Sequence, residues 1–288
     1  MTPDRTTQTE TAAGTRRASA RGRMDDARPA EFVEALAKGL AVLESFDNAH
    51  PDMSLSEIAR RTGSSPAAAR RSLITLQALG YIGRQDKRFH LRPRILTLGS
   101  AFYFSARIDE MLQPFLRDLV TKFGDASSVA TLDKRDVIYV AHNSVQRARR
   151  AAASVGARYP AHATSLGRVL LAAQSDADLD RYFDGLVIDP LTTLTITDPD
   201  VLRAEILRVR ADGYSTTVDQ LDYGITALAV PIRTLDGRTI AALNTSGYTG
   251  MVDPALLIEC RLADLQATSN SITQSLAKYP VLETIIGS

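Results

Sequence analysis

The sequence predicts an α+β protein with two parts, an N-terminal winged helix-turn-helix and a C-terminal domain built on an antiparallel sheet. The chain has 288 residues, which is long for one ordinary domain and suitable for two. Its first third holds three stretches of helical apolar spacing followed by a small basic hairpin. The remainder alternates helical and strand-like segments joined by short turns, which favours an antiparallel sheet of about five or six strands.

The composition excludes several classes of protein. Apolar residues make up 44% of the chain and charged residues 23%, which is typical of a globular protein. No apolar run is long enough to cross a bilayer and the polar N-terminus has no secretory signal, so we expect a cytoplasmic protein without membrane contact. The single Cys260 cannot form an internal disulfide, and the four histidines are scattered. We therefore expect no metal site and no cofactor.

The segment 1–29 is rich in Thr, Ala and Arg and has almost no large apolar side chain. Such a composition does not offset the entropy that is lost on ordering, so we expect a disordered tail. Its six arginines either touch phosphates or belong to a solvated tail without a fixed role.

The N-terminal domain begins with two predicted helices. Apolar residues recur at helical spacing from Glu31 until Asp47 stops them. A short second helix follows at Leu55–Arg61. Ser54 precedes this helix and Glu57 lies three residues later, which is the pattern of a capping box.

The third helix and a hairpin complete this domain. The helix starts at Ser65, with a proline at its first position, and ends at Gly80. Two small strands then bracket the basic turn 83–88. The strands are predicted at Tyr81–Ile82 and Phe89–Leu91. Together these elements indicate a winged helix-turn-helix over 30–94.

A connecting helix is predicted over 95–109, and the second domain over 110–288. The connector carries apolar residues that offer a dimer seam: Leu96, Leu98, Phe102 and Phe104. The second domain opens with an amphipathic helix that ends at Gly124. Its other predicted elements are a hairpin of Val129–Leu132 with Val137–Val140, a strand near Ala152–Val155, helices from Thr164 and at Val201–Arg210, strands at Tyr214–Val218, Thr226–Ile232 and Thr239–Thr245, and a helix at Pro254–Leu276.

The charge is concentrated in one short block. Residues 55–94 carry nine Lys and Arg against two acidic residues, whereas residues 96–288 carry eighteen basic and twenty-two acidic residues. The block therefore suits a polyanion, and the remainder does not. A helix-turn-helix followed by a basic hairpin can lay its second helix in the major groove of DNA, with the hairpin on the backbone or in the minor groove.

We expect the DNA contacts to come from the start of the third helix, from its outward face and from the hairpin. Small alanines allow close approach, arginines grip guanine edges or phosphates, and the serines bond a phosphate at the helix start. The predicted contacts are Ser64, Ser65, Ala67, Ala68, Arg70, Arg71, Thr75, Arg84, Lys87 and Arg88. The alternative for these side chains is a face that is merely solvated.

A ligand site is indicated in the second domain. A loop enters a helix at Thr164 and Ser165, and free amides at a helix start attract a carboxylate, so this position suits an organic acid. On a predicted strand, Ala242, Asn244 and Ser246 share one face. A polar Asn among apolar neighbours needs a hydrogen-bond partner, which is either a ligand hydroxyl or a neighbouring strand.

Three segments resemble the IclR family of bacterial transcriptional regulators. They are LSEIARRTGSSPAAARRSLITLQALGYI, RYPAHATSLGRVLLA and GITALAVPIRTLDGRTIAALNTSG, and they match in order. The resemblance covers about residues 32–280. The stretch AAARRSLITLQALGY is similar to the PcaR/PcaU/PobR branch, which implies a sensor of aromatic acids of the β-ketoadipate pathway, such as protocatechuate and 4-hydroxybenzoate.

The resemblance implies a second domain that binds an effector, is related in shape to GAF domains and holds the ligand against the concave face of its sheet. It also implies homodimers or homotetramers on duplex DNA. The positions that belong to the implied pocket are Thr164, Ser165, Leu166, Ala227, Asn244 and Ser246, with Asp219 at its border. The chain departs from the family pattern at 247–250, where the usual basic residue near the pocket rim is missing.

Each candidate of the pocket also has a structural interpretation. Ser165 would only cap its helix, and Asn244 would only bond a neighbouring strand. Asp219 would be a solvated loop acid, and His162 a satisfied structural histidine.

Other functions remain as alternatives. A small-molecule hydrolase is remote, because Ser165 lies in no GxSxG elbow and no GxxxxGK[ST] phosphate loop is present. An architectural DNA-binding protein without a ligand does not account for the nonbasic second domain. Within the IclR family, an aliphatic keto acid is the alternative effector.

Overall fold

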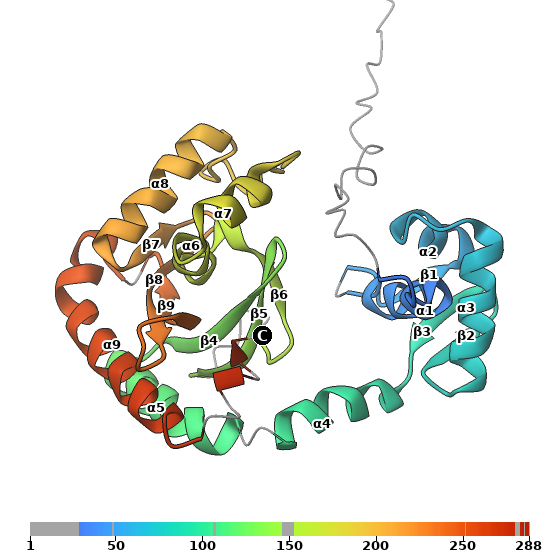
Figure 1. The fold of residues 1–288 in the computed structure, drawn as a ribbon, viewed down its shortest axis with the longest axis horizontal. Helices are drawn as coiled ribbons and strands as arrows, with labels where there is room; N and C mark the ends of the chain where they lie inside the picture. The colour runs from blue at the N-terminus through green and yellow to red at the C-terminus, as the bar shows by residue number, and fades with distance from the viewer. Residues whose placement is uncertain are drawn as a thin grey trace, which may run out of the picture. The chain divides into compact units, whose positions relative to one another are not determined.

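The computed structural model describes residues 29–47, 49–105, 108–145, 153–250, 252–279, 283–284 and 286–287. The predicted tail, 1–29, lies outside these residues except for Pro29. The chain divides into two compact units, Met1–Leu98 and Gly99–Ser288 (Figure 1). Both units mix helices with antiparallel strands, so the predicted α+β class is confirmed. In the described part of the chain, no helix is both long and apolar enough to cross a membrane.

The N-terminal unit packs three helices against a small sheet. The strands follow the order β1-β3-β2, and both pairs are antiparallel. The core includes Val42, Met53, Ile58, Leu73 and Ile82, all fully or almost fully buried. The elements are α1 (Glu34–Glu44), β1 (Asp52–Ser54), α2 (Leu55–Arg61), α3 (Pro66–Ala78), β2 (Ile82–Gln85), β3 (Arg88–Leu91) and the short 3-10 turn η1 (Pro93–Ile95).

Local hydrogen bonds explain where α2 and α3 begin. The Ser54 hydroxyl accepts from the Glu57 amide at 3.3 Å, and the Glu57 carboxylate accepts from the Ser54 amide at 2.7 Å. The predicted capping box is therefore confirmed. At α3 the Ser65 hydroxyl accepts from the Ala68 amide at 3.2 Å, and Pro66 occupies the first helical position, where its missing amide hydrogen costs no bond.

The wing hairpin, β2 and β3 with the turn between them, differs from the prediction. The strands extend into the expected six-residue turn, so that only Asp86 and Lys87 connect them. Asp86 adopts a positive φ of 54°, which closes the turn. The ends of the two strands at the turn were not predicted, because residues 84 and 88 are charged and the alternation of apolar and polar residues is weak there. The third strand, β1, was not predicted because it has only three residues.

The apolar stripe of α1 is not buried as expected. The helix begins at Glu34 rather than Glu31, and its buried member is Val42. Leu36 is 63% exposed and Leu40 is 47% exposed. The spacing correctly predicted a helix, but the described residues of this unit leave Leu36 and Leu40 exposed.

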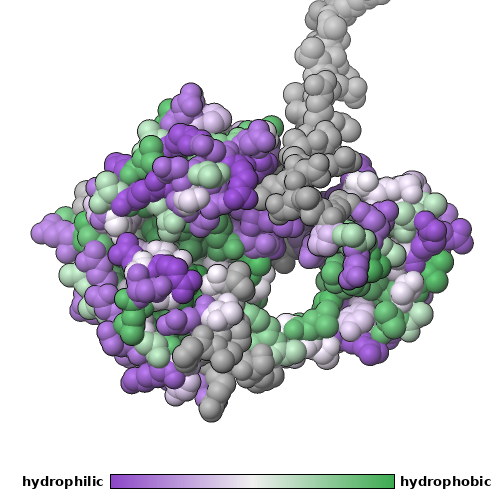
Figure 2. Space-filling model, viewed as in Figure 1, coloured by the Kyte–Doolittle hydropathy of each residue, from purple (hydrophilic) through white to green (hydrophobic). Residues whose placement is uncertain are grey.

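Helix α4 (Leu96–Ser105) lies within the range 95–109, for which a connecting helix is predicted. Leu96 and Leu98 are exposed, and the part of this helix that is coloured in Figure 2 is largely green, the colour of hydrophobic residues. The side chain of Phe104 lies outside the described residues.

The C-terminal unit is a six-stranded antiparallel sheet of order β6-β5-β4-β9-β8-β7. Helices α5 and α9 pack on one face and α6, α7 and α8 lie on the other, so that two apolar clusters flank the sheet (Figure 1). The elements are α5 (Ile108–Phe123), β4 (Ala126–Asp133), β5 (Asp136–Ser144), β6 (Arg158–Pro160), the 3-10 turn η2 (Ala161–Ala163), α6 (Ser165–Ala172), α7 (Asp176–Phe183), α8 (Pro199–Asp212), β7 (Ser215–Val218), β8 (Ile225–Arg233), β9 (Thr239–Tyr248) and α9 (Pro254–Leu276).

Two elements of this unit differ from the prediction. The strand expected near Ala152–Val155 is wrong, because Gly156, with a φ of 84°, turns the chain and pairing with β5 begins only after it. Residue 152 itself lies outside the described residues. Helix α7 was not predicted, because its sequence is acidic. Ser175 nevertheless caps it by accepting from the Asp178 amide at 3.2 Å.

Candidate nucleic-acid interface and effector site

Helix α3 presents a cationic outer face. Ala69, Leu73 and Leu76 are buried in the core, as predicted, which turns Arg70 and Arg71 outward. Neither arginine has an ion-pair or hydrogen-bond partner for its side chain among the described residues, so both guanidinium groups are available to a ligand. The small side chain of Ala67 is exposed beside them.

The start of α3 combines amides and hydroxyls. Ser65 lies exposed and uses its hydroxyl as the helix cap, whereas Ser64 and Ala68 are half-buried. Thr75 lies one turn beyond Arg71 and donates its hydroxyl to the Arg71 carbonyl at 3.1 Å. The structure thus places the predicted residues of this helix on one accessible side.

Ile74 lies on the same side of α3 and was missed. Its side chain is 57% exposed although it is large and apolar. Three-residue spacing from Arg71 puts it on the outer face. That spacing could have revealed it, and an apolar side chain at this place suits contact with a thymine methyl group.

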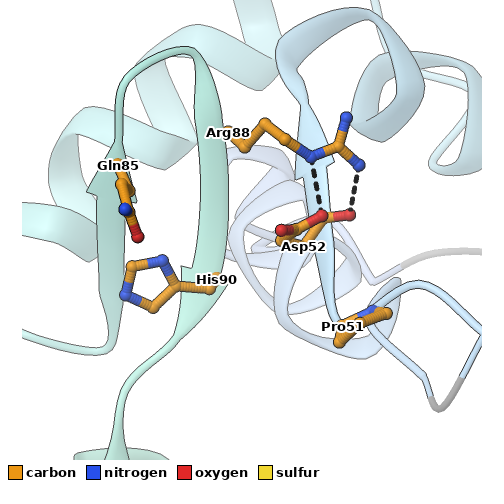
Figure 3. A pocket seen from close by; sticks show the side chains of 5 residues that line it. All are labelled: Pro51, Asp52, Gln85, Arg88 and His90. Carbon is orange, nitrogen blue, oxygen red and sulfur yellow. Dashed lines mark hydrogen bonds and ion pairs between the residues drawn. The ribbon is translucent and has the colours of Figure 1, made fainter.

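The two arginines of the wing hairpin lie on opposite faces of the small sheet. Arg84 is paired with Phe89, stacks over its ring at 5.6 Å, and donates to the Asp86 carbonyl at 2.7 Å. Arg88 points to the other face and contacts Asp52 (Figure 3). Lys87, at the turn, is exposed and has no side-chain partner within the described ranges.

In the C-terminal unit, the structure resolves which residue caps α6. The Thr164 hydroxyl accepts from the Gly167 amide at 2.9 Å and is therefore the cap. Ser165 is only 1% exposed, and its hydroxyl has no hydrogen-bond partner in the described structure. Leu166 is buried in the core beside it. Ser165 is thus a buried polar group without a structural role as a cap.

Gly167 sets how closely α6 approaches the preceding turn. A Cβ atom at this position would lie 2.1 Å from the Ala161 carbonyl oxygen, which is inside any real contact distance. The glycine therefore lets η2 pack against the start of α6.

A row of small and polar residues crosses the sheet face that α6 covers. The register pairs His142 with Ser128, Ser128 with Asn244, Asn244 with Ala229 and Ala229 with Ser215. Directly paired residues of antiparallel strands point to the same side, so all five line one face. His142, Ser128 and Ser215 were not predicted, although two serines in the apolar strand β4 were a readable signal.

The adjacent row contains two more predicted residues. Ser246 pairs with Ala227 and with Ala126 on the other side, and Ala227 pairs with Thr217. The structure therefore brings Ala227, Asn244 and Ser246 together on one face of the sheet.

Three atoms of the polar row lack a partner within the described part of the chain, and one of them is the buried Ser215 hydroxyl. Asn244 accepts the Ser128 amide at 2.9 Å through Oδ1, which leaves its Nδ2 unused. His142 Nδ1 lies 2.9 Å from the Ser128 hydroxyl, whereas its Nε2 is buried and unpaired. Burial lowers the pKa of His142, so the ring is neutral near pH 7.

Asp219 organises the loops at the end of the sheet. Its Oδ1 accepts from the Gly224 amide at 2.7 Å and from the Thr249 hydroxyl at 2.8 Å, and its carbonyl accepts from the Thr192 hydroxyl at 2.6 Å. Asp219 therefore connects the loops at Thr192, Gly224 and Thr249 and is not a solvated loop acid.

Arg168 connects α6 to the same loops from inside the core. It is buried and donates to the His162 carbonyl at 2.9 Å and to Gln220 Oε1 at 2.8 Å, with Glu205 at 3.6 Å. Burial lowers the pKa of Arg168 to about 10, so it stays charged near pH 7. Burial and the charge of Arg168 lower the pKa of His162 to about 4. Its Nε2 has no partner among the described side chains and main chain.

Within the described residues, no group of three or more His, Cys, Asp and Glu side chains is placed to hold a metal ion. The polar row offers neutral hydroxyl, amide and imidazole groups instead, which match an organic ligand with its own hydroxyl or carboxyl groups.

Comparison with known proteins gives two matches to family models. The IclR helix-turn-helix domain matches residues 35–86. The bacterial transcriptional regulator IclR C-terminal domain matches residues 102–274. The two matches account for most of the chain and place α3 within the first and the polar row within the second.

Individual relatives match over most of their length. The chain is 36% identical over 247 residues to the Pca regulon regulatory protein of Pseudomonas putida, covering 85% of each chain. It is 34% identical over 253 residues to the p-hydroxybenzoate hydroxylase transcriptional activator of Acinetobacter baylyi, covering 86% of this chain and 93% of the relative. It is also similar to the structure of an IclR homologue from Microbacterium hydrocarbonoxydans complexed with 4-hydroxybenzoate, with a TM-score of 0.64, 25% identity, and coverage of 84% of this chain and 98% of that chain.

Proposed function

Since this chain belongs to the IclR family of bacterial transcriptional regulators, we propose that it binds operator DNA through α3 and the wing hairpin and is controlled by a hydroxylated aromatic carboxylate. DNA binding by the helix-turn-helix and small-molecule binding by the C-terminal domain are properties of the family. What we propose is which residues make these contacts and which class of acid is the effector. The hydrolase alternative is dropped, because this is a family of regulators and not of enzymes.

The outer face of α3 supports the DNA contacts. Arg70 and Arg71 have no partner among the described residues, and Ser65 is exposed at the helix start, where its hydroxyl accepts the Ala68 amide. Ala67 and Thr75 complete the face that meets the base edges, while Arg84 and Lys87 follow the backbone. Ser64 and Ala68, which are half-buried, border this surface.

The unpaired buried hydroxyl of Ser165 is the observation that carries the effector proposal. A buried polar group without a partner costs free energy, and a bound ligand removes that cost. Ser165 lies at the first position of α6, where free amides and the positive end of the helix dipole favour a carboxylate. We assign the effector carboxylate to this helix start, with Thr164 and Leu166 as its immediate neighbours.

The sheet face supports an aromatic ring that carries a hydroxyl. Ala227 and Ala229 carry only methyl side chains on this face, and Asn244 Nδ2 and His142 Nε2 remain to be paired. A phenol hydroxyl both donates and accepts, so it suits His142 in either tautomer. The relatives named for the pca regulon and for p-hydroxybenzoate hydroxylase, and the homologue that binds 4-hydroxybenzoate, support the same ligand class.

Calorimetric titration of the full chain with 4-hydroxybenzoate and protocatechuate tests the effector. We expect saturable binding of at least one of them and weaker binding of benzoate, which has no ring hydroxyl. If neither acid binds and an aliphatic keto acid such as pyruvate does, the aromatic class is contradicted and the alternative effector is favoured.

We also propose that the protein acts as a homodimer or homotetramer. One reading helix contacts few base pairs, so specific binding needs at least two copies on repeated or palindromic half-sites. The exposed apolar residues Leu36 and Leu40 of α1 and Leu96 and Leu98 of α4 supply a seam. Light scattering of the full chain at low micromolar concentration is expected to give a dimeric or tetrameric mass, and a monomeric mass contradicts this proposal.

The effector acts on DNA binding through a difference in affinity. A ligand changes an equilibrium between two arrangements of the oligomer only when it binds them unequally. By reciprocity, bound operator changes the affinity for the effector by the same factor. Titration of the acid with and without operator DNA therefore measures the coupling, and equal affinities in the two experiments contradict control by this acid.

A further inference from the structure

Arg88 of the wing hairpin directs all three guanidinium nitrogens toward oxygen atoms of its own unit. Its Nε lies 2.6 Å from Asp52 Oδ1, and its Nη2 donates to the Asp52 carbonyl at 2.8 Å. Its Nη1 lies 3.5 Å from Glu57 Oε2. Figure 3 shows the side chain reaching from β3 to Asp52, while Gln85 and His90 stay on the hairpin. The arginine thus joins the hairpin to β1 and to the first turn of α2.

The partners of Arg88 are themselves fixed. The Glu57 oxygen that faces Arg88 also accepts the Ser54 amide in the capping box at 2.7 Å. Asp52 belongs to β1, which pairs with β3 over only three residues. So short a strand pair holds the hairpin weakly by itself, and the contacts of Arg88 add a side-chain connection at the same place.

The charge around Arg88 does not suit a phosphate. Two carboxylates, Asp52 and Glu57, surround the guanidinium group, and Arg60 also acts on Glu57, so these four groups together carry no net positive charge. An open hollow of about 330 Å³ beside the guanidinium is lined by Asp52, Gln85, His90 and Pro51 (Figure 3). A phosphate that entered it would meet the Asp52 carboxylate. Lys87, one residue earlier at the turn, makes no ion pair with a carboxylate in the described structure.

We propose that Arg88 is a positioning residue that sets the wing hairpin through Asp52 and Glu57, and that Lys87 and Arg84 make the contacts of the wing with DNA. The proposal rests on the proposed DNA-binding function of α3 and the hairpin. It replaces the expectation that Arg88 itself contacts DNA. This role of Arg88 means that the Asp52 carboxylate strengthens the binding of DNA, although both are negatively charged.

The Asp52→Asn variant separates the two roles of Arg88 by the sign of its effect. If Arg88 held a phosphate, removing the competing carboxylate would tighten DNA binding. If Arg88 positions the hairpin, the variant weakens binding by about two- to fivefold, the range of a partly exposed ion pair. The measurement is fluorescence anisotropy of the full chain with a labelled DNA fragment from directly upstream of its gene.

The salt dependence supplies the matched control. Lys87→Gln removes a phosphate contact and lowers the slope of log affinity against log salt by about one. Arg88→Gln lowers affinity without changing that slope, and the double variant Asp52→Asn/Arg88→Gln is no weaker than the weaker single variant. Arg88→Lys also loses affinity, because an ammonium group does not replace the two-pronged contact with Asp52.

A footprint distinguishes a displaced hairpin from general unfolding. In Arg88→Gln, hydroxyl-radical protection by the wing is expected to vanish while protection by α3 persists, and the thermal midpoint is expected to stay within a few degrees. Parallel loss of both protections indicates unfolding and overturns the positioning role.

Failure of this proposal is distinguishable from failure of the proposed function. Tighter or unchanged binding by Asp52→Asn, together with a reduced slope for Lys87→Gln, overturns the role of Arg88 and leaves the DNA surface intact. An unchanged affinity and slope for both Lys87→Gln and Arg71→Ala overturns the DNA surface itself.

Discussion

The outer face of α3 and the polar row of the large sheet present polar groups of opposite kinds. On α3, Arg70 and Arg71 are exposed cations without partners among the described residues. In the sheet, His142 and Asn244 are neutral groups with unpaired polar atoms, and the His142 Nε2 is buried. Exposed charges attract at long range but are screened by salt, whereas buried polar atoms act at short range and favour a ligand of matching shape.

This difference has a consequence for stability. Truncating an exposed, unpaired arginine removes no contact of the folded chain, so DNA binding changes without a change in the free energy of unfolding. A buried neutral group is coupled to folding, because the native structure disfavours its charged form. Substitutions on the outer face of α3 are therefore expected to change DNA binding without changing stability. Substitutions in the polar row are expected to change both ligand binding and stability.

The largest expected effect is the acid sensitivity that His162 gives to the C-terminal unit. Its pKa is about 4 in the folded protein, below its ordinary value of 6.5, because it is buried and lies near Arg168. The unfolded chain therefore binds the proton more readily. The stabilisation is fully present above pH 6.5 and is lost as the pH falls toward 4, which amounts to up to about 3 kcal/mol.

The measurement is urea unfolding followed by circular dichroism at pH 7, 5.5 and 4.5. Carboxylates titrate in the same range, so the quantity of interest is the difference between the wild type and His162→Gln. We expect a smaller pH dependence in the variant. Identical pH dependence of both proteins contradicts the neutral buried state of His162.

Next in size is the effect of Arg71→Ala on DNA binding. If Arg71 reads a base, the variant weakens specific binding by about 1 to 3 kcal/mol, and if it holds a phosphate it chiefly reduces the salt slope by about one. Unfolding should change by less than about 0.5 kcal/mol, because the side chain has no partner in the described structure. Arg181→Ala, on α7, is the control for loss of an exposed arginine and should leave DNA binding unchanged. If Arg71→Ala leaves both the operator affinity and the salt slope unchanged, Arg71 does not contact DNA.

The smallest effects are expected at two adjacent residues at the start of α6. Thr164→Ala removes the helix cap and costs about 1 kcal/mol of stability. Ser165→Ala removes a hydroxyl that has no partner among the described residues, so stability is retained while the affinity for 4-hydroxybenzoate falls by about two- to tenfold. Thermal unfolding and calorimetry of both variants check the pair. Equal losses of stability would show that Ser165 is a structural residue.

The N-terminal unit was largely predictable because its signals are local. The Ser54 and Glu57 capping box, the proline at the start of α3 and the helical spacing of its apolar residues act within a few positions of the chain. The ion pair of Arg88 was not predictable, because its partner Asp52 lies 36 residues earlier on a strand that was not predicted. A list of basic residues does not distinguish a free cation from a paired one.

The residues of the proposed effector site were predicted only in part, because their arrangement depends on strand register. Alternation along β9 correctly put Asn244 and Ser246 on one face. The neighbours that complete the row, Ser128 and His142, come from strands more than a hundred residues away and are aligned only by pairing. Whether Thr164 or Ser165 caps α6 also required coordinates, since both residue types are good caps.

The most direct test of the whole account is a titration of the upstream DNA fragment with the full chain at stepwise salt concentrations, with and without 4-hydroxybenzoate or protocatechuate. The account predicts binding that weakens linearly in log affinity against log salt, and a shift of that line when an effector is present. The absence of DNA binding even at the lowest salt concentration, both with and without these acids, contradicts this account.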